Sequence, residues 1–310
     1  MKKILCAVAL TASFACLFSC SKNNQSPESV TVAPAGDTAH HAVRMSVSDF
    51  EAQYTNMRLV NLQNDSAQYL KYLFAGIYDA SGRLVSWREQ QRGWQFDTAF
   101  GKFNWALTSG TYSVVFVATT DTLIGKYYLL NNKADSLAGL RIKNYWSNGG
   151  VDVFYNKTTF TVGNMDTVVN SIQLSRISGK IEVHLKDNSQ LLDSTSMTVT
   201  IKGYPAFYSV GGNFYSPANP GDSITLKKVS ARVYEGFCLG SSNKINTAFR
   251  GFLYKPGLGQ QFFTKVLNNV DVYVYTNKRT VLSGYLAGPD SGTIYLSADA
   301  EFSETVLTNF

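Results

Sequence analysis

Short runs of β-branched and aromatic residues recur along the whole chain, and they constrain its fold more than any other feature. The clearest run covers residues 110–118, GTYSVVFVA, where almost every side chain favours an extended backbone. Turn-forming Gly, Asn, Asp and Pro separate the runs at intervals of about 8–12 residues, which is typical of β-sandwiches. Only 16% of the 310 residues are charged, and the helix-favouring Glu, Lys and Ala are few beside the plentiful Val, Thr, Tyr, Phe, Ser and Asn. This composition argues against a coiled coil, a helical bundle or a disordered chain.

Each run predicts a strand. Residues 70–78 and 83–87 are expected to form a hairpin, because the Asp-Ala-Ser-Gly sequence at 79–82 is typical of a tight connection. Residues 178–185 alternate apolar and polar side chains, which indicates a strand with one wet face. Rough helical spacing at 133–148 is the weak exception. Further strands are expected at 102–107, 110–118, 151–155, 158–162, 167–174, 196–202, 223–226, 231–239, 248–254, 270–275, 280–286, 293–296 and 302–307.

The N-terminus is typical of an export signal. Two lysines follow the first methionine, and residues 4–18 form an apolar segment that is too short to span a membrane comfortably. The segment ends in Leu-Phe-Ser-Cys, which resembles the lipobox of bacterial lipoproteins, whose cysteine becomes the first mature residue and carries the lipid. We therefore expect a lipoprotein signal peptide at 1–19 and lipidation at Cys20. Cys16 is a weaker alternative acceptor, and an ordinary signal peptide that happens to end near a cysteine is the plain alternative.

The remaining chemistry-bearing residues are few. Cys238 lies in an apolar run and is expected to be a buried thiol rather than a nucleophile. The net charge of +6 is scattered, without the dense basic stripe of a nucleic-acid-binding protein. No known catalytic motif is present. We expect no enzyme activity, no metal, no cofactor and no nucleic-acid partner, and we interpret all three histidines as solvated: His40, His41 and His184.

The chain divides into a polar leader and two halves of similar length. Residues 20–45 are rich in polar residues that cannot bury a core, and they predict a lipidated tether. A junction near residues 175–179 would give an N-terminal β-sandwich domain at 46–177 and a C-terminal one at 178–310.

Three stretches resemble a known family. They are FAGIYDASGRL at 74–84, LTSGTYSVVFVA at 107–118 and IQLSRISGKIEV at 172–183. Their order is similar to that in the FimB/Mfa2 family of fimbrial anchor lipoproteins from Bacteroides-type bacteria. The features of that family are a strand that ends in Asp-x-x-Gly, a strand with a Gly-x-Tyr motif and a Leu-x-Arg motif before the second domain. The resemblance implies two tandem transthyretin-like (Greek-key) β-sandwich domains. It also implies an outer-membrane lipoprotein at the cell surface that meets other fimbrial subunits by donor-strand exchange, in which a strand of one subunit completes the sheet of the next.

The resemblance leaves the role within a fimbria open. An anchor keeps its lipid, whereas a stalk subunit loses its N-terminal segment by cleavage after an Arg or Lys. Arg44, at the end of the tether, is the candidate for such processing, although a solvated Arg is the plain alternative. The C-terminal segment 301–310 is a candidate assembly strand or an ordinary closing strand, and its apolar residues are Phe302, Val306, Leu307 and Phe310.

Eight Asp-Ser/Thr triplets end in Ala, Ile, Leu, Val or Thr, which is more than the composition alone predicts. The triplet resembles an O-glycosylation signal of Bacteroides-type exported proteins, and turn chemistry before a strand explains it equally well. The candidate acceptors are Thr38, Ser66, Thr98, Thr122, Ser136, Thr167, Ser194 and Ser223.

A second function remains in view. Trp87 and Trp94 lie in or beside a polar stretch rich in Gln and Arg, where exposed indole rings would stack on sugars. This predicts, as the alternative to a fimbrial role, a surface lipoprotein that binds glycans or host molecules. The alternative explanation for both tryptophans is that their rings pack in the core of the fold.

Overall fold

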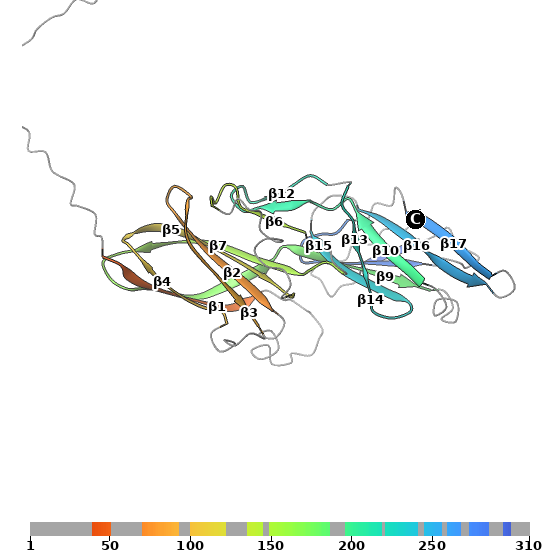
Figure 1. Ribbon diagram of the computed structural model, residues 1–310, viewed down its shortest axis with the longest axis horizontal. Coiled ribbons are helices and arrows are strands. Elements are labelled where there is room, and N and C mark those ends of the chain that lie inside the picture. The colour runs from red at the N-terminus through yellow and green to blue at the C-terminus, as the bar shows by residue number, and fades with distance from the viewer. Residues whose placement is uncertain are drawn as a thin grey trace, which may run out of the picture. The chain divides into compact units, whose positions relative to one another are not determined.

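The computed structural model describes residues 39–50, 70–92, 100–121, 135–144, 149–186, 196–218, 221–240, 245–255, 259–267, 273–284 and 294–298. All regular elements in these ranges are strands, arranged in four sheets (Figure 1). The predicted all-β class is confirmed for this part of the chain. The predicted signal peptide and most of the tether lie outside the described residues.

The largest sheet has seven strands and is nearly closed, like a barrel (Figure 1). Its pairing is antiparallel except between the first and eighth strands, which run parallel. The order across it is β3 (Leu84–Gln91), β2 (Tyr72–Asp79), β5 (Gly110–Thr119), β7 (Val153–Val162), β8 (Thr167–Arg176), β1 (His41–Phe50) and β4 (Lys102–Leu107).

The Gln90 side chain joins the two edge strands of this sheet. Its Nε2 donates to the Lys102 carbonyl at 2.7 Å, and its Oε1 accepts from the Gly101 amide at 2.7 Å. The carbonyl of Gly101 in turn accepts from the Val47 amide of β1 at 2.9 Å. Gly101 has φ = 86°, a backbone conformation that favours glycine. The side-chain amide of Gln90 therefore makes the hydrogen bonds between β3 and β4 that backbone amides make between the other strands.

The inside of the seven-stranded sheet is a continuous apolar core. Alternate residues of its strands point inward, so that β4 shows a strict exposed–buried alternation. Trp105, 5% exposed, stacks on Phe103 with ring centroids 5.3 Å apart. The fully buried members of this core, each at most 3% exposed, are Val43, Met45, Leu70, Leu73, Ala75, Ile77, Phe103, Leu107, Val114, Phe116, Ala118, Phe154, Val162 and Leu174.

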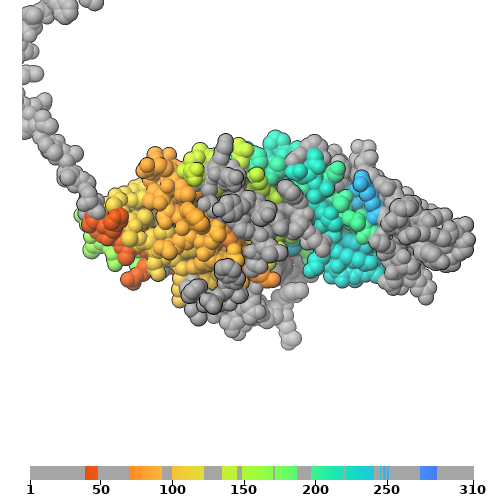
Figure 2. Space-filling model, viewed as in Figure 1, coloured from red at the N-terminus to blue at the C-terminus, as the bar shows by residue number. Residues whose placement is uncertain are grey.

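A second apolar cluster covers the outer face of β2 and β5. It contains Tyr72, Phe74 and Tyr78 of β2, and it is completed by Leu140 and Ile142. A three-stranded sheet contributes part of the cover, with the order β12 (Phe214–Tyr215), β11 (Phe207–Ser209) and β6 (Arg141–Lys143). Figure 2 shows the yellow-green surface of the segment that holds β6 beside the cyan surface around β12.

The helical spacing at 133–148 predicted the wrong element. The described residues there form a turn at 135–139 and then β6, with no helix. Leu137 and Leu140 are three residues apart because one tight turn separates them, whereas Leu140 and Ile142 alternate as in a strand. Tertiary packing over β2 and β5 therefore determined the local structure.

The other two sheets face each other across a third apolar cluster, which includes Ile181, Val183, Val199, Ile201 and Tyr234. The five-stranded sheet has the order β14 (Lys227–Lys228), β15 (Val233–Leu239), β9 (Ser178–Leu185), β18 (Arg279–Gly284) and β19 (Ile294–Ala298). The four-stranded sheet has the order β13 (Ile224–Thr225), β10 (Ser196–Lys202), β16 (Asn246–Lys255) and β17 (Gly259–Leu267).

Several strand boundaries differ from the prediction. Residues 151–155 and 158–162 are parts of one strand, β7, because the polar Asn156 and Lys157 between them continue its pairing with β5. β17 was not predicted at all, and of the strand expected at 270–275 the described residues 273–275 contain only a single bridge. β1 begins at His41, inside the predicted tether, so the interpretation of His41 as a solvated loop residue is wrong: it is half-buried in a strand.

The predicted hairpin between β2 and β3 is present, and Asp79 organises its turn. The Oδ1 of Asp79 accepts from the Ser81 and Arg83 amides, each at 3.0 Å, and from the Ser81 hydroxyl at 2.6 Å. Gly82 has φ = 78°, and its carbonyl accepts from the Leu137 amide at 2.7 Å. The Asp-x-x-Gly motif is therefore a turn that also holds the segment covering the second cluster.

We expect Asp79→Asn to lower stability in a pH-dependent manner. The bonds from the Ser81 hydroxyl and the Arg83 amide hold the pKa of Asp79 at about 2, below its ordinary value of 3.8. A lowered folded-state pKa stabilises the fold above the ordinary value, and the effect is lost as the pH falls towards about 2. Urea-unfolding midpoints of the two chains should differ at neutral pH and converge near pH 2. A pH-independent difference would contradict this account.

Candidate functional site

The first strand is the candidate site, because it is the element nearest the predicted lipid and the predicted cleavage position. β1 lies between two partners: it runs antiparallel to β4 and parallel to β8. It is thus an interior strand of the seven-stranded sheet, although it begins the described part of the chain. Val43 and Met45, 0% and 2% exposed, point into the core from it.

Arg44 lies in the middle of this paired region. Its register partners are Asn104 of β4 and Val168 of β8, and its side chain is exposed on the outer face of the sheet. A protease needs an extended, accessible backbone, whereas the backbone here is paired on both sides. Cleavage after Arg44 therefore requires β1 to leave the sheet locally.

Cleavage after Arg44 would also remove only a small part of β1 from the sheet. Only four residues of β1, at positions 41–44, would be removed, and Val43 is the only one of them that is fully buried. Met45 and the following residues would keep their pairing with β4 and β8. The vacated groove would be too short for a strand of the usual length of about five or six residues.

The Gly-x-Tyr motif of β5 also has a structural explanation. The Tyr112 hydroxyl donates to the Thr108 carbonyl at 3.0 Å and lies 3.1 Å from the Thr108 hydroxyl. The ring stacks on Phe160 with centroids 5.8 Å apart. This is the geometry of a tyrosine corner, in which the hydroxyl ties a strand to the loop before it.

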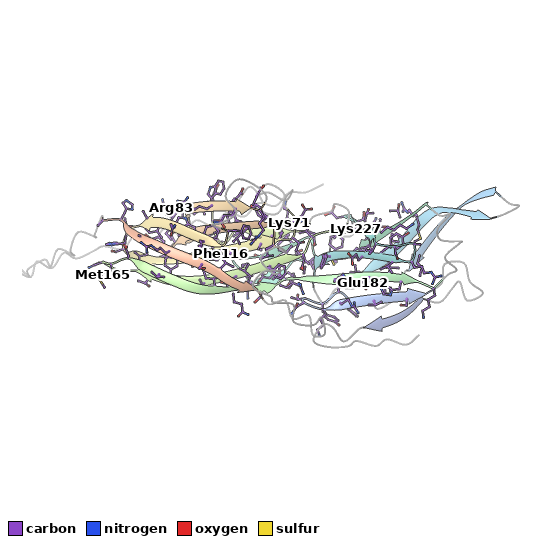
Figure 3. The ribbon with its side chains drawn as sticks, turned by 90° about the horizontal axis from the view of Figure 1, so that it is seen from below. Lys71, Arg83, Phe116, Met165, Glu182 and Lys227 are labelled. Carbon is purple, nitrogen blue, oxygen red and sulfur yellow. The ribbon has the colours of Figure 1, made fainter. Side chains whose placement is uncertain are left out.

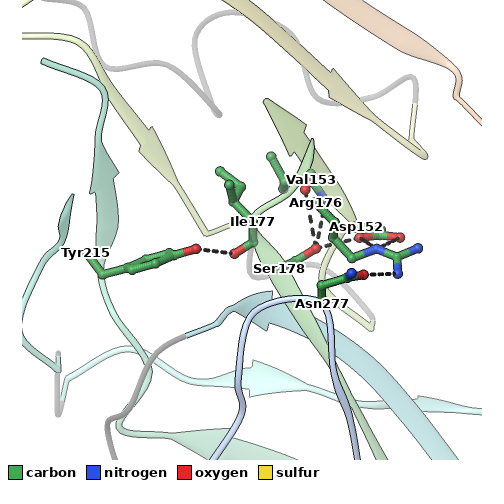
Figure 4. A network of polar contacts seen from close by, with 7 residues as sticks. All are labelled: Asp152, Val153, Arg176, Ile177, Ser178, Tyr215 and Asn277. Carbon is green, nitrogen blue, oxygen red and sulfur yellow. Dashed lines mark hydrogen bonds and ion pairs between the residues drawn. The ribbon is translucent and has the colours of Figure 1, made fainter. Parts of the chain in front are cut away.

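The Leu-x-Arg motif places Arg176 in a buried ion pair at the end of β8 (Figure 4). Its Nε lies 3.0 Å from the Asp152 Oδ1, and the two side chains are 1% and 0% exposed. The guanidinium also lies over the Phe154 ring, 5.0 Å from its centroid. Burying two charges is tolerated because each satisfies the other and both make further hydrogen bonds.

The same pair connects β8 to the second half of the chain. Arg176 Nη1 donates to the Asn277 side chain at 2.9 Å, and the Ser178 hydroxyl donates to Asp152 (Figure 4). Tyr215, of β12, donates to the Ile177 carbonyl at 3.0 Å. These contacts fix residues 176–178, where the predicted domain junction lies. Asp79, Tyr112 and Arg176, the motif residues of the three family-like stretches, thus each have a role in the fold.

Charged residues gather on the outer face of the five-stranded sheet. Glu182 and Glu235 lie opposite each other on β9 and β15, and Lys180 Nζ bridges them at 2.7 and 2.9 Å. His184 Nε2 lies 2.9 Å from Glu182, and Arg279 Nη1 lies 3.7 Å from it. Two carboxylates directly opposite would repel each other without the cations between them.

These contacts correct the expectation of a uniformly wet face on residues 178–185. Glu182 is only 6% exposed, whereas the apolar positions are buried as predicted. Burial acts to raise the pKa of Glu182, but its bonds with Lys180 and His184 outweigh burial and lower it. Burial likewise acts to lower the pKa of Lys180, and its bonds to the two glutamates raise it. His184 is half-exposed and paired rather than simply solvated.

Trp87 is partly exposed, as the glycan alternative requires. Its residue is 43% exposed on the edge strand β3, and Val85 beside it is 45% exposed. The indole also stacks on the buried Phe74 with centroids 6.5 Å apart, and it lies opposite Gly76 in the register of β2. Stacking on Phe74, a member of the second apolar cluster, gives Trp87 a structural role as well.

Three of the proposed glycosylation acceptors are described. Ser136 is exposed in the turn before β6, Thr167 is the first residue of β8, and Ser223 directly precedes β13. Thr167 and Ser223 lie where a strand begins, as the turn-chemistry explanation also predicts, whereas Ser136 lies within its turn and its hydroxyl accepts from the Gly139 amide at 3.1 Å. The remaining predicted site residues lie outside the described ranges: Cys20, Thr38, Ser66, Trp94, Thr98, Thr122, Ser194, Phe302, Val306, Leu307 and Phe310.

Cys238 is buried in the third apolar cluster, as predicted. It is 1% exposed, and burial raises the pKa of its thiol to about 12, so it is inert as a nucleophile. Within the described ranges, no three His, Cys, Asp or Glu side chains lie close enough to hold a metal ion. The same ranges contain no helix with the length and apolar character needed to cross a membrane.

Sequence patterns missed the two buried ionic networks. Arg176 was part of a recognised motif, but its partner Asp152 is 24 positions away and carries no distinguishing neighbour. Glu182 occupied a position that strand alternation assigned to solvent. The Leu-x-Arg motif near the predicted junction is the signal that pointed to Arg176.

The sequence matches no family model and no curated protein. Solved structures similar to the chain include the fimbrial anchor protein Mfa2 of Porphyromonas gingivalis, at 14% identity and a TM-score of 0.41 over 83% of this chain and 95% of that one. The tip fimbrial protein Mfa3 of the same organism is similar at 13% identity and 0.46, over 84% and 98%. A fimbrial assembly protein of Parabacteroides distasonis gives 12% and 0.43, over 87% and 98%. These structures are of fimbrial anchor, tip and assembly proteins, and each match spans most of this chain.

Proposed function

We propose that the protein is a fimbrial subunit of the cell surface that anchors or terminates a fimbria. Its lipid, on Cys20, would hold it in the outer membrane, and neighbouring subunits would join it by donor-strand exchange. The observation that carries the proposal is the position of β1: the first strand of the described residues is built into the interior of its own sheet, and it begins at His41, 21 positions after the cysteine of the lipobox-like sequence. The proposal assigns the protein no enzymatic activity.

The anchor role is favoured over the stalk role because cleavage after Arg44 would not open a groove along the whole of β1. A stalk subunit needs an open groove for the next subunit's strand, and removal of positions 41–44 leaves most of β1 in place. An uncleaved Arg44 keeps the lipid attached and the sheet complete. Partner strands would then add at a free sheet edge, where unpaired backbone groups accept an extended segment.

The test is to prevent lipidation of the protein in cells that carry fimbriae. In cells that carry Cys20→Ser, we expect whole fimbriae in the culture medium, because nothing holds their base. In unmodified cells, the chain should be found at one end of each fimbria, with a mass that includes the lipid and residues 20–44. Fractionation, immunogold labelling and intact-mass analysis make the three measurements.

Cys16→Ser is the matched control, because it alters the alternative acceptor in the same signal segment. Fimbriae should stay attached to these cells. If fimbriae are released from cells with Cys16→Ser and not from cells with Cys20→Ser, the lipid is carried by Cys16 instead of Cys20. Immunogold label along the whole fimbria, on chains that begin at Met45, would contradict the anchor role and support a stalk role.

Glycan binding is a second candidate function, favoured by the 43% exposure of Trp87 on an edge strand. Trp87→Ala should abolish retention on immobilised glycans if the ring is a platform, while Trp105→Ala, in the core, should unfold the chain instead. Retention that is unaffected in a folded Trp87→Ala chain would leave Trp87 with its structural role alone.

The exposed Ser136 and the Ser or Thr residues of the other triplets remain proposed glycosylation acceptors. A ladder of intact masses above the lipid-corrected mass would support their glycosylation.

A further inference from the structure

We propose that the turn between β7 and β8, with the adjoining outer face of β1, is the surface that contacts the lipid bilayer. This inference rests on the proposed lipid tether and adds the orientation of the folded body. Met165, at the tip of the turn, is 79% exposed, and Val168, at the start of β8, is 56% exposed. Met165 and Val168 are three positions apart and are the two most exposed large apolar residues in the part of the chain that the structure describes. Exposed apolar groups that gather on one surface mark sites of contact with a protein or a membrane.

A cation lies beside these apolar side chains. Arg44 is the register partner of Val168, so the two residues share the outer face of the sheet, and both are exposed. Apolar groups flanked by a long cationic side chain suit a membrane interface, where the apolar groups enter the acyl region and the cation stays at the headgroups. The nearby Asp166 carboxylate is engaged by the Ala42 amide at 2.9 Å.

The bond between Ala42 and Asp166 also supports a bilayer as the surface that covers this patch. It places the turn beside the start of β1, where the chain from the lipidation site enters the described body. Figure 3 shows Met165 at the end of the seven-stranded sheet where β1 begins. Cys20 and Ala39 are 19 residues apart, so this end can lie no farther than about 65 Å from the lipid.

Tethering makes a small contact patch sufficient. Once the lipid is inserted, contact between the turn and the bilayer becomes intramolecular, with a high effective concentration. The other exposed large apolar residues of the described ranges are Val85 and Trp87 of β3, Phe214 of β12 and Val229 after β14, and none of them lies on β1 or on a strand paired with it. The patch next to the tether is therefore assigned to lipid rather than to a protein partner.

The experiment uses the full, lipidated chain in phosphatidylcholine vesicles. Met165→Cys is labelled with an environment-sensitive fluorophore, and Phe214→Cys, at 52% exposure, is the matched control. Cys238 is buried and stays unlabelled. With a nitroxide quencher on the lipid tails, we expect several-fold quenching of the label at position 165 and little change at position 214.

The outcomes separate this inference from the proposed function. Equal, weak quenching at both positions in a chain that floats with the vesicles would overturn the inference and leave the anchor in place. A label at position 165 that responds to protein concentration but not to the lipid quencher would assign the patch to a second copy and also overturn it. A chain that does not float would overturn both. In a chain that floats, loss of the quenching in Met165→Cys combined with Val168→Glu would support the apolar contact.

Discussion

Arg176→Met should lower the free energy of unfolding by about 3–5 kcal/mol, the usual cost of leaving a buried charge without its partner. The substitution keeps a long apolar stem but removes the guanidinium, so the Asp152 carboxylate, 0% exposed, loses its counter-charge. It also removes the bond to Asn277. Urea unfolding followed by tryptophan fluorescence measures the loss, with the slope checked for two-state behaviour.

Two further chains show whether charge burial is the cause. The double variant Arg176→Met/Asp152→Leu should recover much of the lost stability, because an apolar pair of similar volume has no charge to desolvate. Arg83→Met makes the same chemical change at a residue whose side chain is 79% exposed, and it should leave the unfolding midpoint nearly unchanged. A double variant that is less stable than Arg176→Met would show that the network positions the backbone, independently of charge.

Met45→Ala should cost about 2–5 kcal/mol, the range for truncating a buried Met. Met45 is 2% exposed in the core of the seven-stranded sheet, opposite Phe103 of β4. The truncation leaves a cavity and weakens the hold of β1 on the sheet. Local opening of β1 should then become easier, so trypsin should cleave after Arg44 faster than in the unmodified chain.

Ser46→Ala is the control in the same strand, because Ser46 lies between Met45 and Val47 without a core position of its own. It should change neither stability nor the rate of cleavage appreciably. Equal cleavage rates in Met45→Ala and Ser46→Ala would show that Arg44 is accessible without opening of β1. That result would weaken the argument for an uncleaved anchor.

Strong local patterns predicted the fold class and many of the elements. Residues 110–118 became the buried strand β5, and Asp79 to Gly82 became the expected hairpin turn. These succeeded because alternation, β-propensity and turn chemistry act over a few residues. Burial of Cys238 and of the apolar positions of β9 followed from the same patterns.

Features that depend on distant partners could not be predicted in this way. Residues 135–144 are shaped by the cluster over β2 and β5, so their local spacing was misleading. The parallel pairing of β1 with β8 joins positions more than 120 residues apart, and no motif announces it. The candidate site was predicted as a loop-end Arg44, whereas pairing on both sides makes it part of a central strand.

The pairing of β1 has a mechanical consequence for a tethered protein. A load applied at Ala39 along the strand axis would act on the hydrogen bonds to β4 and β8 in shear, because these bonds cross between strands. Many bonds on both sides would have to break together, instead of one after another as in the peeling of an edge strand. Under such a load the survival time is governed by the unfolding rate, and an interior β1 would slow that rate at the point where, in the proposed anchor, traction from the membrane would enter the fold.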